Sequence, residues 1–179
     1  MKLPLETERL WIQLFRLEDA ERLHIVFSDP EVMARIRAGP SPSIEVTRQR
    51  LARIMEHQDK NGFSMWALIE KGSGVLIGDC GLILVEWRGP EVELAYEIGR
   101  AFWGKGYATE AARACLRFGF ENLKLSRIIA LTDADHLASR RVIEKIGMKN
   151  DGIVHYYGRS LVQYSATKPN SESAQLSLS

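Results

Sequence analysis

The sequence predicts an α+β fold: one mixed, mostly antiparallel sheet of about six to seven strands, with helices on both faces. Two observations support this class. Segments that alternate apolar and polar residues follow one another by short, glycine-containing connections, which favours hairpins. Segments with helical spacing separate some of these strands, and the expected order is β-α-α-β-β-β-α-β-α-β-β.

The first third of the chain contains one expected strand and two expected helices. RLWIQLF at 9–15 alternates apolar and polar side chains and is typical of a strand. Residues 17–36 carry a helical stripe of apolar residues that Pro30 interrupts. Residues 44–60 carry a second stripe, and the Gly-, Pro- and Ser-rich segment at 38–43 is the loop between them.

A hairpin is predicted next. NGFSMWALIE at 61–70 starts with a turn and becomes a strand, KGSG forms a turn, and VLIGDCGLILV at 75–85 is the returning strand. Gly78 and Gly81 within it indicate a bulge or a close approach of another backbone.

The rest of the chain continues the alternation and ends in a polar segment. The expected elements are a strand at 92–98, a helix to about Asn122, a strand at 126–133, a helix at 136–149 that Gly147 closes, and a hairpin at 152–167. No linker divides the chain, so residues 1–167 are expected to form one domain. Residues 168–179 are expected to be a mobile C-terminal tail.

The composition bounds the partners. Among 179 residues, 45% are hydrophobic, and 24 basic against 23 acidic side chains give a net charge of +1, which provides no global basic field for nucleic acid. No apolar run has the length of a membrane span, and the N-terminus lacks a signal-peptide segment. Cys80 and Cys115 lie in apolar runs and are expected to be buried, reduced thiols. We therefore expect a cytoplasmic protein, monomer or homodimer, with no metal site.

The most informative short segment is WGKGYATEA at 103–111, where a strand passes into a helix. The start of a helix presents free N–H groups and a partial positive charge. Gly104 and Gly106 would let an anion approach these groups, so the segment suits a phosphate or pyrophosphate. The dinucleotide-binding fingerprint is absent, because Thr109 stands where its third glycine would fall. The alternative is a tight connection that binds no ligand.

This segment resembles the pyrophosphate loop of the GNAT superfamily of acyl-CoA-dependent N-acetyltransferases, which usually reads Arg/Gln-x-x-Gly-x-Gly/Ala. Gly106 and Ala108 match that pattern and Trp103 departs from it. Other segments are similar, in the same order, to the branch that contains ribosomal-protein alanine N-acetyltransferases. They are LETERLWIQLFRLEDAERL, DPEVM, VLIGDCGLI, ELAYEIGRAFWGKGYATEA and ASRRVIEKIGM, and together they span residues 5 to about 165.

The resemblance implies direct transfer of an acetyl group from acetyl-CoA, as cosubstrate, to a primary amine. It implies that the strand before the glycine segment splays from its neighbour and that the pantetheine arm inserts there. The implied contacts are backbone groups of Tyr96, Glu97 and Ile98 for the pantetheine, and the loop Trp103, Gly104, Lys105, Gly106, Tyr107, Ala108 and Thr109 for the pyrophosphate.

An amine with a pKa near 8–10 is mostly protonated at neutral pH, so the reaction needs a base. Glu91, Glu93 and Glu97 alternate along one face of the strand at 92–98 and its approach. Glu93 stands where the branch often has Glu and is the first candidate, followed by Glu97. A charged, solvated strand face is the plain alternative, and water can also carry the proton.

The leaving thiolate needs a donor, and here the chain departs from the family. The tyrosine that many members use is replaced by Ile143, and the usual asparagine by His136. The resemblance points to Ser139 as a donor to the thioester sulfur, whereas the alternative is a serine bonded to local backbone. His136 is either a residue near the helix N-cap or a contact to the pantetheine.

The acceptor is assigned by resemblance alone. A protein or peptide N-terminal amine is the first candidate, and a small amine such as an amino acid, polyamine or antibiotic is the second. A non-catalytic acyl-CoA-binding module is the rival from another class. His155, Tyr156 and Tyr157 on the last hairpin are expected either to line the acceptor pocket or to pack in the core, and His57 near a helix end is expected to be solvated.

Overall fold

The computed structural model describes residues 3–168. Of the predicted mobile tail at 168–179, all but Lys168 lies outside the described residues. The helices and strands are β1 Leu5–Glu6, β2 Leu10–Gln13, α1 Ala20–Phe27, α2 Pro30–Met33, α3 Ile44–Asn61, β3 Met65–Glu70, β4 Leu76–Leu84, β5 Val92–Ile98, α4 Tyr107–Glu121, β6 Arg127–Thr132, α5 Leu137–Lys145, β7 Lys149–Tyr156 and β8 Arg159–Thr167.

The predicted class is confirmed: the strands form one mixed sheet in the order β1-β2-β3-β4-β5-β6-β8-β7. Only β5 and β6 pair in parallel within residues 3–168, and the other neighbours are antiparallel. The sheet has eight strands in this part of the chain, more than the six to seven predicted. The additional strand is β1, whose two residues are too few to show a period of two.

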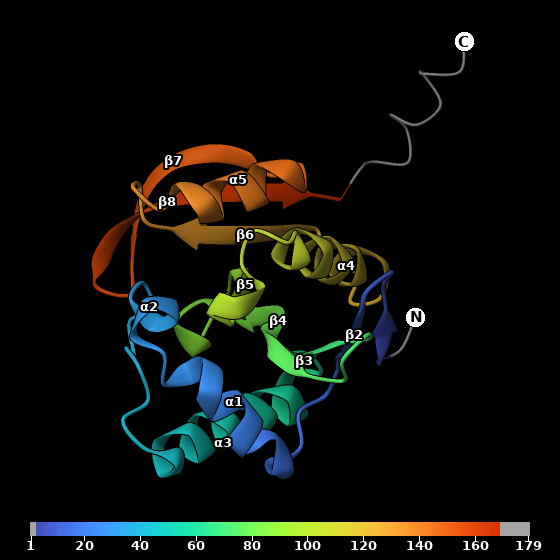
Figure 1. Ribbon diagram of the computed structural model, residues 1–179. Helices are drawn as coiled ribbons and strands as arrows, with labels where there is room; N and C mark the ends of the chain where they lie inside the picture. The colour runs from blue at the N-terminus through green and yellow to red at the C-terminus, as the bar shows by residue number, and fades with distance from the viewer. Residues whose placement is uncertain (1–2, 169–179) are drawn as a thin grey trace.

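Helices cover both faces of this sheet, as predicted (Figure 1). α1 and α3 lie on one face, and α4 and α5 lie on the other, so the molecule has three layers. Each layer boundary has its own core. Trp66, Leu82 and Phe118 belong to the core under α4 and α5, whereas Leu23 and Leu51 belong to the core under α1 and α3.

The sheet opens between β5 and β6. β4 and β5 are paired over seven residues, from Gly78 with Ile98 to Leu84 with Val92. β5 and β6 share a single registered pair, Glu93 with Ile129. The two parallel strands therefore diverge beyond Glu93, and the predicted splay is confirmed.

Two glycines on β4 mark close backbone contacts, as the sequence indicated. A Cβ at Gly78 would lie 2.0 Å from the carbonyl oxygen of Glu97, and a Cβ at Gly81 would lie 2.1 Å from that of Ser64. The register also shifts at Leu68, the residue of β3 opposite Gly78. β4 can thus approach both neighbours only because these positions lack side chains.

One side-chain prediction is confirmed and another is wrong. Cys80 and Cys115 are buried free thiols. His57 is not solvated but 6% exposed, because α3 turns this side chain toward the sheet. Its Nδ1 lies 2.8 Å from the carbonyl oxygen of Phe63, and its Nε2 accepts from the N–H of Leu84 at 3.3 Å. Separately, no helix within residues 3–168 is long and apolar enough to cross a membrane.

Candidate active site

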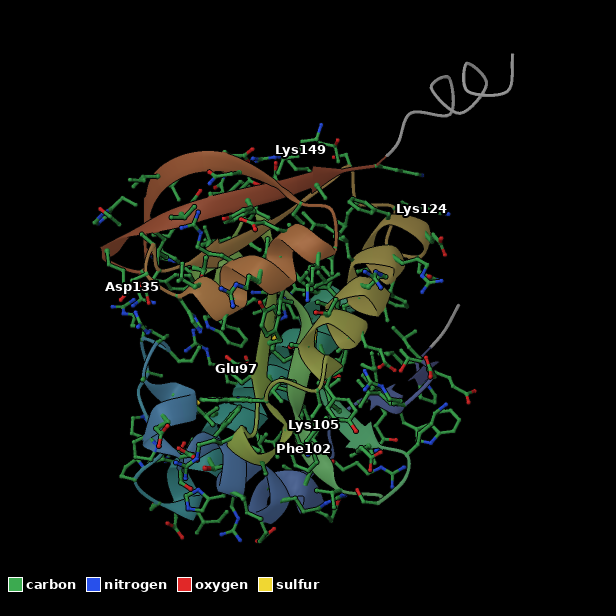
Figure 2. All side chains as sticks on the ribbon, turned by 45° about the horizontal axis from the view of Figure 1, so that its top comes forward. Glu97, Phe102, Lys105, Lys124, Asp135 and Lys149 are labelled. Carbon is green, nitrogen blue, oxygen red and sulfur yellow. The ribbon has the colours of Figure 1, made fainter. Side chains whose placement is uncertain are left out.

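The glycine segment forms a turn at the start of α4. Gly104 and Gly106 have φ of 73° and 84°, a left-handed conformation that favours glycine. Gly106 is the N-cap, so Tyr107, Ala108 and Thr109 form the first turn, and their N–H groups have no partner within the helix. The Lys105 side chain is exposed above the ring of Phe102 (Figure 2). This arrangement suits an anion.

Arg9 holds this turn in place through contacts with its backbone and side chains, a role that the sequence pattern did not indicate. Its guanidinium donates to the carbonyl oxygen of Lys105 at 2.8 Å and to Glu110 at 2.7 Å, and it lies over the ring of Tyr107. The Thr7 hydroxyl donates to Glu110 at 2.6 Å. Burial raises the pKa of Glu110, but the bonds from Thr7 and Arg9 outweigh it and the net shift is downward. Glu110 therefore stays ionised and fixes the first turn of α4 to the turn between β1 and β2.

The open edge of β5 presents backbone groups to the splay. The N–H of Gly99 donates to the carbonyl oxygen of Ile77 on the β4 side. Because successive backbone groups of a strand point to alternate sides, those of Ile98 and Tyr96 point to the open side, whereas Glu97 pairs with Asp79 on β4. Of the three residues predicted to meet an inserted ligand by their backbone, Tyr96 and Ile98 therefore have the required direction.

Trp103 reaches the end of this open edge. Its indole Nε1 donates to the carbonyl oxygen of Ile98 at 2.6 Å, while the residue remains 46% exposed. The side chain thus caps a carbonyl that faces the opening between β5 and β6. The resemblance placed Trp103 in the loop expected to hold the pyrophosphate and marked it as a departure from the usual residue, with no indication of this contact.

Glu93 lies at the point where the sheet begins to open, and it is only 7% exposed. The interpretation of this residue as part of a solvated face is therefore wrong. Burial raises its pKa to about 7, opposed by a hydrogen bond from Tyr157 and by the charge of Arg159. The Tyr157 hydroxyl donates to Glu93 Oε2 at 2.6 Å. A carboxyl that titrates near neutral pH can both accept and release a proton in this range.

Glu97 is engaged elsewhere. It lies opposite Asp79 on β4, and burial raises the pKa of both carboxyls, with the charge of Glu97 adding to the rise at Asp79. The protonated form of both carboxyls is therefore favoured, and within residues 3–168 Asp79 Oδ1 and Glu97 Oε2 have no hydrogen-bond partner. By contrast, Glu91 forms an ion pair with Arg127 at 3.0 Å. The three glutamates of the strand region thus have three different environments.

On the side of the opening that α5 covers, the side chains of Ser139 and Tyr96 are in contact. The Ser139 hydroxyl lies 2.9 Å from the Tyr96 hydroxyl, and either can donate; Tyr96 also reaches the Ser139 carbonyl at 3.2 Å. Burial raises the pKa of Tyr96, so its hydroxyl stays protonated. Ile143 is 1% exposed in the core, and His136 is the N-cap of α5 without a side-chain capping bond. Burial lowers the pKa of His136, assisted by the charge of Arg35.

A set of ion pairs ties the segments around Glu93. Arg35, which follows α2, contacts Asp135 at 2.5 Å in the loop between β6 and α5. Arg159 at the start of β8 contacts Asp133 at 3.2 Å and donates to the Arg35 carbonyl oxygen at 2.7 Å. Three loops that are distant in sequence are thus held together beside the open side of the sheet.

Comparison with known proteins decides the family. The model of the acetyltransferase (GNAT) domain matches residues 9–149. The chain belongs to the GNAT acetyltransferase family. It is an N-acetyltransferase, and the glycine turn and the splay between β5 and β6 lie inside the matched region.

Relatives of this GNAT chain cover most of its length. It is 29% identical to p20 of Bacillus licheniformis, named an uncharacterized N-acetyltransferase, over 87% of this chain and 88% of that one. A solved GNAT-family acetyltransferase of Bacillus anthracis is 30% identical, covers 91% of this chain and 97% of its own, and has a TM-score of 0.78. A ribosomal-protein alanine acetyltransferase of Vibrio fischeri is 19% identical, with 94% and 100% covered and a TM-score of 0.76, and shares the fold.

The buried carboxyl pair of this GNAT chain predicts how its stability depends on pH. The folded-state pKa values of Asp79 and Glu97 are raised above their ordinary values of 3.8 and 4.5. The pair therefore stabilises the fold fully below those values, and this contribution is lost as pH rises. Asp79→Asn removes one ionisation. We expect the drop in melting temperature between pH 5 and pH 8, measured by circular dichroism, to become smaller in this variant.

A matched control is Asp151→Asn. The hydrogen bond from Ser165 is the main cause that lowers the pKa of Asp151, and Arg127 adds to it. Its contribution to stability has the opposite sign, present above the ordinary value and lost as pH falls. If the drop in melting temperature between pH 5 and pH 8 became smaller by the same amount in both variants, the assignment of this drop to Asp79 and Glu97 would be contradicted.

Proposed function

We propose that this N-acetyltransferase transfers the acetyl group of acetyl-CoA directly to a primary amine, with Glu93 as the base. The observation that carries the proposal is the position of Glu93. It is a buried carboxyl with a pKa of about 7, at the start of an opening in the sheet, and the same strand leads into the glycine turn at the start of α4.

The donor would lie along β5. The free N–H groups of Tyr107, Ala108 and Thr109 suit the pyrophosphate, and Lys105 adds a positive charge nearby. The pantetheine amides would pair with backbone groups of Tyr96 and Ile98 that face the opening. His136 at the start of α5 is a further contact in this proposal.

Glu93 would take a proton from the acceptor ammonium and so produce the free amine, which attacks the thioester carbonyl. A C–N bond forms, the C–S bond breaks, and the thiolate leaves. The nitrogen releases a second proton to solvent as the amide forms, and solvent returns a proton to the group that protonates the thiolate. The hydroxyls of Ser139 and Tyr96 lie together beside the opening, and one of their protons can pass to the thiolate while the other keeps the pair joined. Glu97 is the less suitable base because Asp79 faces it.

The acceptor we propose is the α-amine at a protein or peptide N-terminus. The fold shared with a ribosomal-protein alanine acetyltransferase and the sequence resemblance to that branch support it. A small amine is the second candidate. The acceptor screen described next compares peptides with single amino acids and polyamines and so distinguishes the two.

A first experiment measures thiol release from acetyl-CoA with peptides beginning in alanine, and in parallel with single amino acids and polyamines. With the best acceptor, kcat/KM should rise with pH through about 7, because Glu93 must be ionised. Glu93→Gln should lower kcat/KM about 100-fold or more at pH 7 and recover partly at high pH. Glu97→Gln should do less. Full activity of Glu93→Gln from pH 6 to 9 would exclude this base.

A second experiment tests the phosphate site by charge reversal. Lys105→Glu should weaken CoA binding about 10-fold in calorimetry, with a larger effect at low salt, because the new carboxylate lies beside the pyrophosphate. Lys149→Glu makes the same charge change on β7. Figure 2 shows Lys149 at the top of the view, well away from Lys105 in its lower half, so this variant should leave the affinity unchanged. Equal effects in both variants would show general electrostatics rather than a site.

A third experiment tests the hydroxyl pair. Ser139→Ala and Tyr96→Phe should each lower kcat about 10-fold. The reason is that each variant loses one hydrogen bond to a developing charge, and such a bond contributes about 1.5–3 kcal/mol. The double variant should cost less than the product of the two, because the hydroxyls share one bond. The KM for acetyl-CoA should change little. Unaltered single-turnover rates in both single variants would remove the pair from the mechanism.

A further inference from the structure

The turn between β7 and β8 has an unusual residue at its tip. The turn consists of Tyr157 and Gly158, which both have a positive φ, of 54° and 74° respectively. Two positive φ values are typical of the tightest hairpin turns, but these normally contain Asn, Asp or Gly at the first position. A bulky aromatic residue in a left-handed conformation is strained, and such strain persists where surrounding contacts enforce it.

Those contacts come from Glu86, in the connection between β4 and β5. The N–H of Glu86 donates to the Tyr157 hydroxyl at 3.1 Å, and the N–H of Tyr157 donates to Glu86 Oε1 at 2.9 Å. Glu86 also has a positive φ of 54°. We call this reciprocal contact the Glu86–Tyr157 latch. It joins segments 71 residues apart and fixes both position and rotation of the phenol.

The latch determines where the proton of the phenol goes. A tyrosine hydroxyl has one proton to donate and can also accept. Here it accepts from the backbone of Glu86, and it donates to Glu93 Oε2 at 2.6 Å. Glu93 Oε2 is therefore occupied, and Oε1 is the oxygen left to receive a proton from a substrate.

We propose that Tyr157 is a positioning residue, which holds the Glu93 carboxylate through Oε2 so that Oε1 faces the acceptor amine. This inference rests on the proposed role of Glu93 as the base. The sequence resemblance placed the last hairpin near the acceptor but left Tyr157 only a choice between lining a pocket and packing in the core. The hydrogen bonds assign it a defined task within the reaction.

The groups around Glu93 determine in which direction its pKa should change when the Tyr157 hydroxyl is removed. The groups that face Glu93 are Tyr157 and Arg159 from the hairpin and Glu97 from its own strand. Tyr157 and Arg159 lower the pKa of Glu93, while burial and Glu97 raise it. Loss of the phenol hydroxyl therefore raises this pKa above about 7. Since the base acts when ionised, the acidic limb of the pH–rate profile must move to higher pH.

The test compares Tyr157→Phe with Tyr156→Phe, which removes the same hydroxyl from the neighbouring residue. The hydrogen bonds of the described residues include none between Tyr156 and Glu93. The titration of Glu93 is followed by carboxyl ¹³C NMR, with Glu93→Gln to assign the signal. The pH dependence of kcat/KM is measured with the acceptor that gives the fastest thiol release in the amine screen.

For Tyr157→Phe we expect the Glu93 midpoint and the acidic limb to rise together by about one pH unit, a tenfold change in the ionisation constant. At pH 6, kcat/KM should fall at least about tenfold. Above pH 8 it should recover only in part, because the lost orientation of Oε1 remains when Glu93 is ionised, and the KM for acetyl-CoA should not change. Tyr156→Phe should leave the NMR midpoint of Glu93 and the acidic limb of the profile at their wild-type pH, even if its KM for the acceptor changes.

Two kinds of result would overturn the inference, and they differ in whether the proposed role of Glu93 as the base survives. If Glu93→Gln is inactive but Tyr157→Phe keeps the wild-type profile and NMR midpoint, Tyr157 has no positioning role and the proposed base stands. A lower melting temperature in Tyr157→Phe with an unmoved acidic limb leads to the same conclusion, since a purely structural latch acts on stability alone. If Glu93→Gln is fully active, the proposed base fails and the role of Tyr157 fails with it.

Discussion

The single registered pair between β5 and β6 is the constraint on which the rest of the structure depends. Parallel strands that stayed paired would use their backbone groups on each other. Here they diverge beyond Glu93, so the N–H and carbonyl groups of Tyr96 and Ile98 face an opening inside the sheet. The N–H groups at the start of α4, which have no partner within the helix, follow directly after this strand and the glycine turn.

The second feature is carboxyls buried beside this opening. Burial favours the protonated form, so Glu93, Glu97 and Asp79 all have raised pKa values. Their partners then separate their roles. Glu97 and Asp79 face each other across two strands, whereas Glu93 has a phenol on one oxygen. Desolvation raises these pKa values, and the hydrogen bond from Tyr157 distinguishes Glu93 from the other two carboxyls.

Contacts between distant segments hold both ends of the site. Arg9 and Glu110 attach the glycine turn to the turn between β1 and β2, so the position of the glycine turn depends on the segment before β2. At the other end, the Glu86–Tyr157 latch attaches the last hairpin above Glu93. The site therefore requires the sheet to be assembled from its first strand to its last two.

The sequence by itself determined the fold class, all strands except β1 and the strand-to-helix glycine turn, because hydrophobic periodicity and glycine act over a few residues. It also pointed to Glu93 and Ser139, but only through resemblance. It contained no sign of the roles of Arg9 and Asp79, nor of the partner that Tyr157 holds, and it misplaced His57 in solvent. Only the tertiary structure decided these, because burial and hydrogen bonding between residues far apart in the chain leave no local pattern, and they alone set which carboxyl is suited to act as a base.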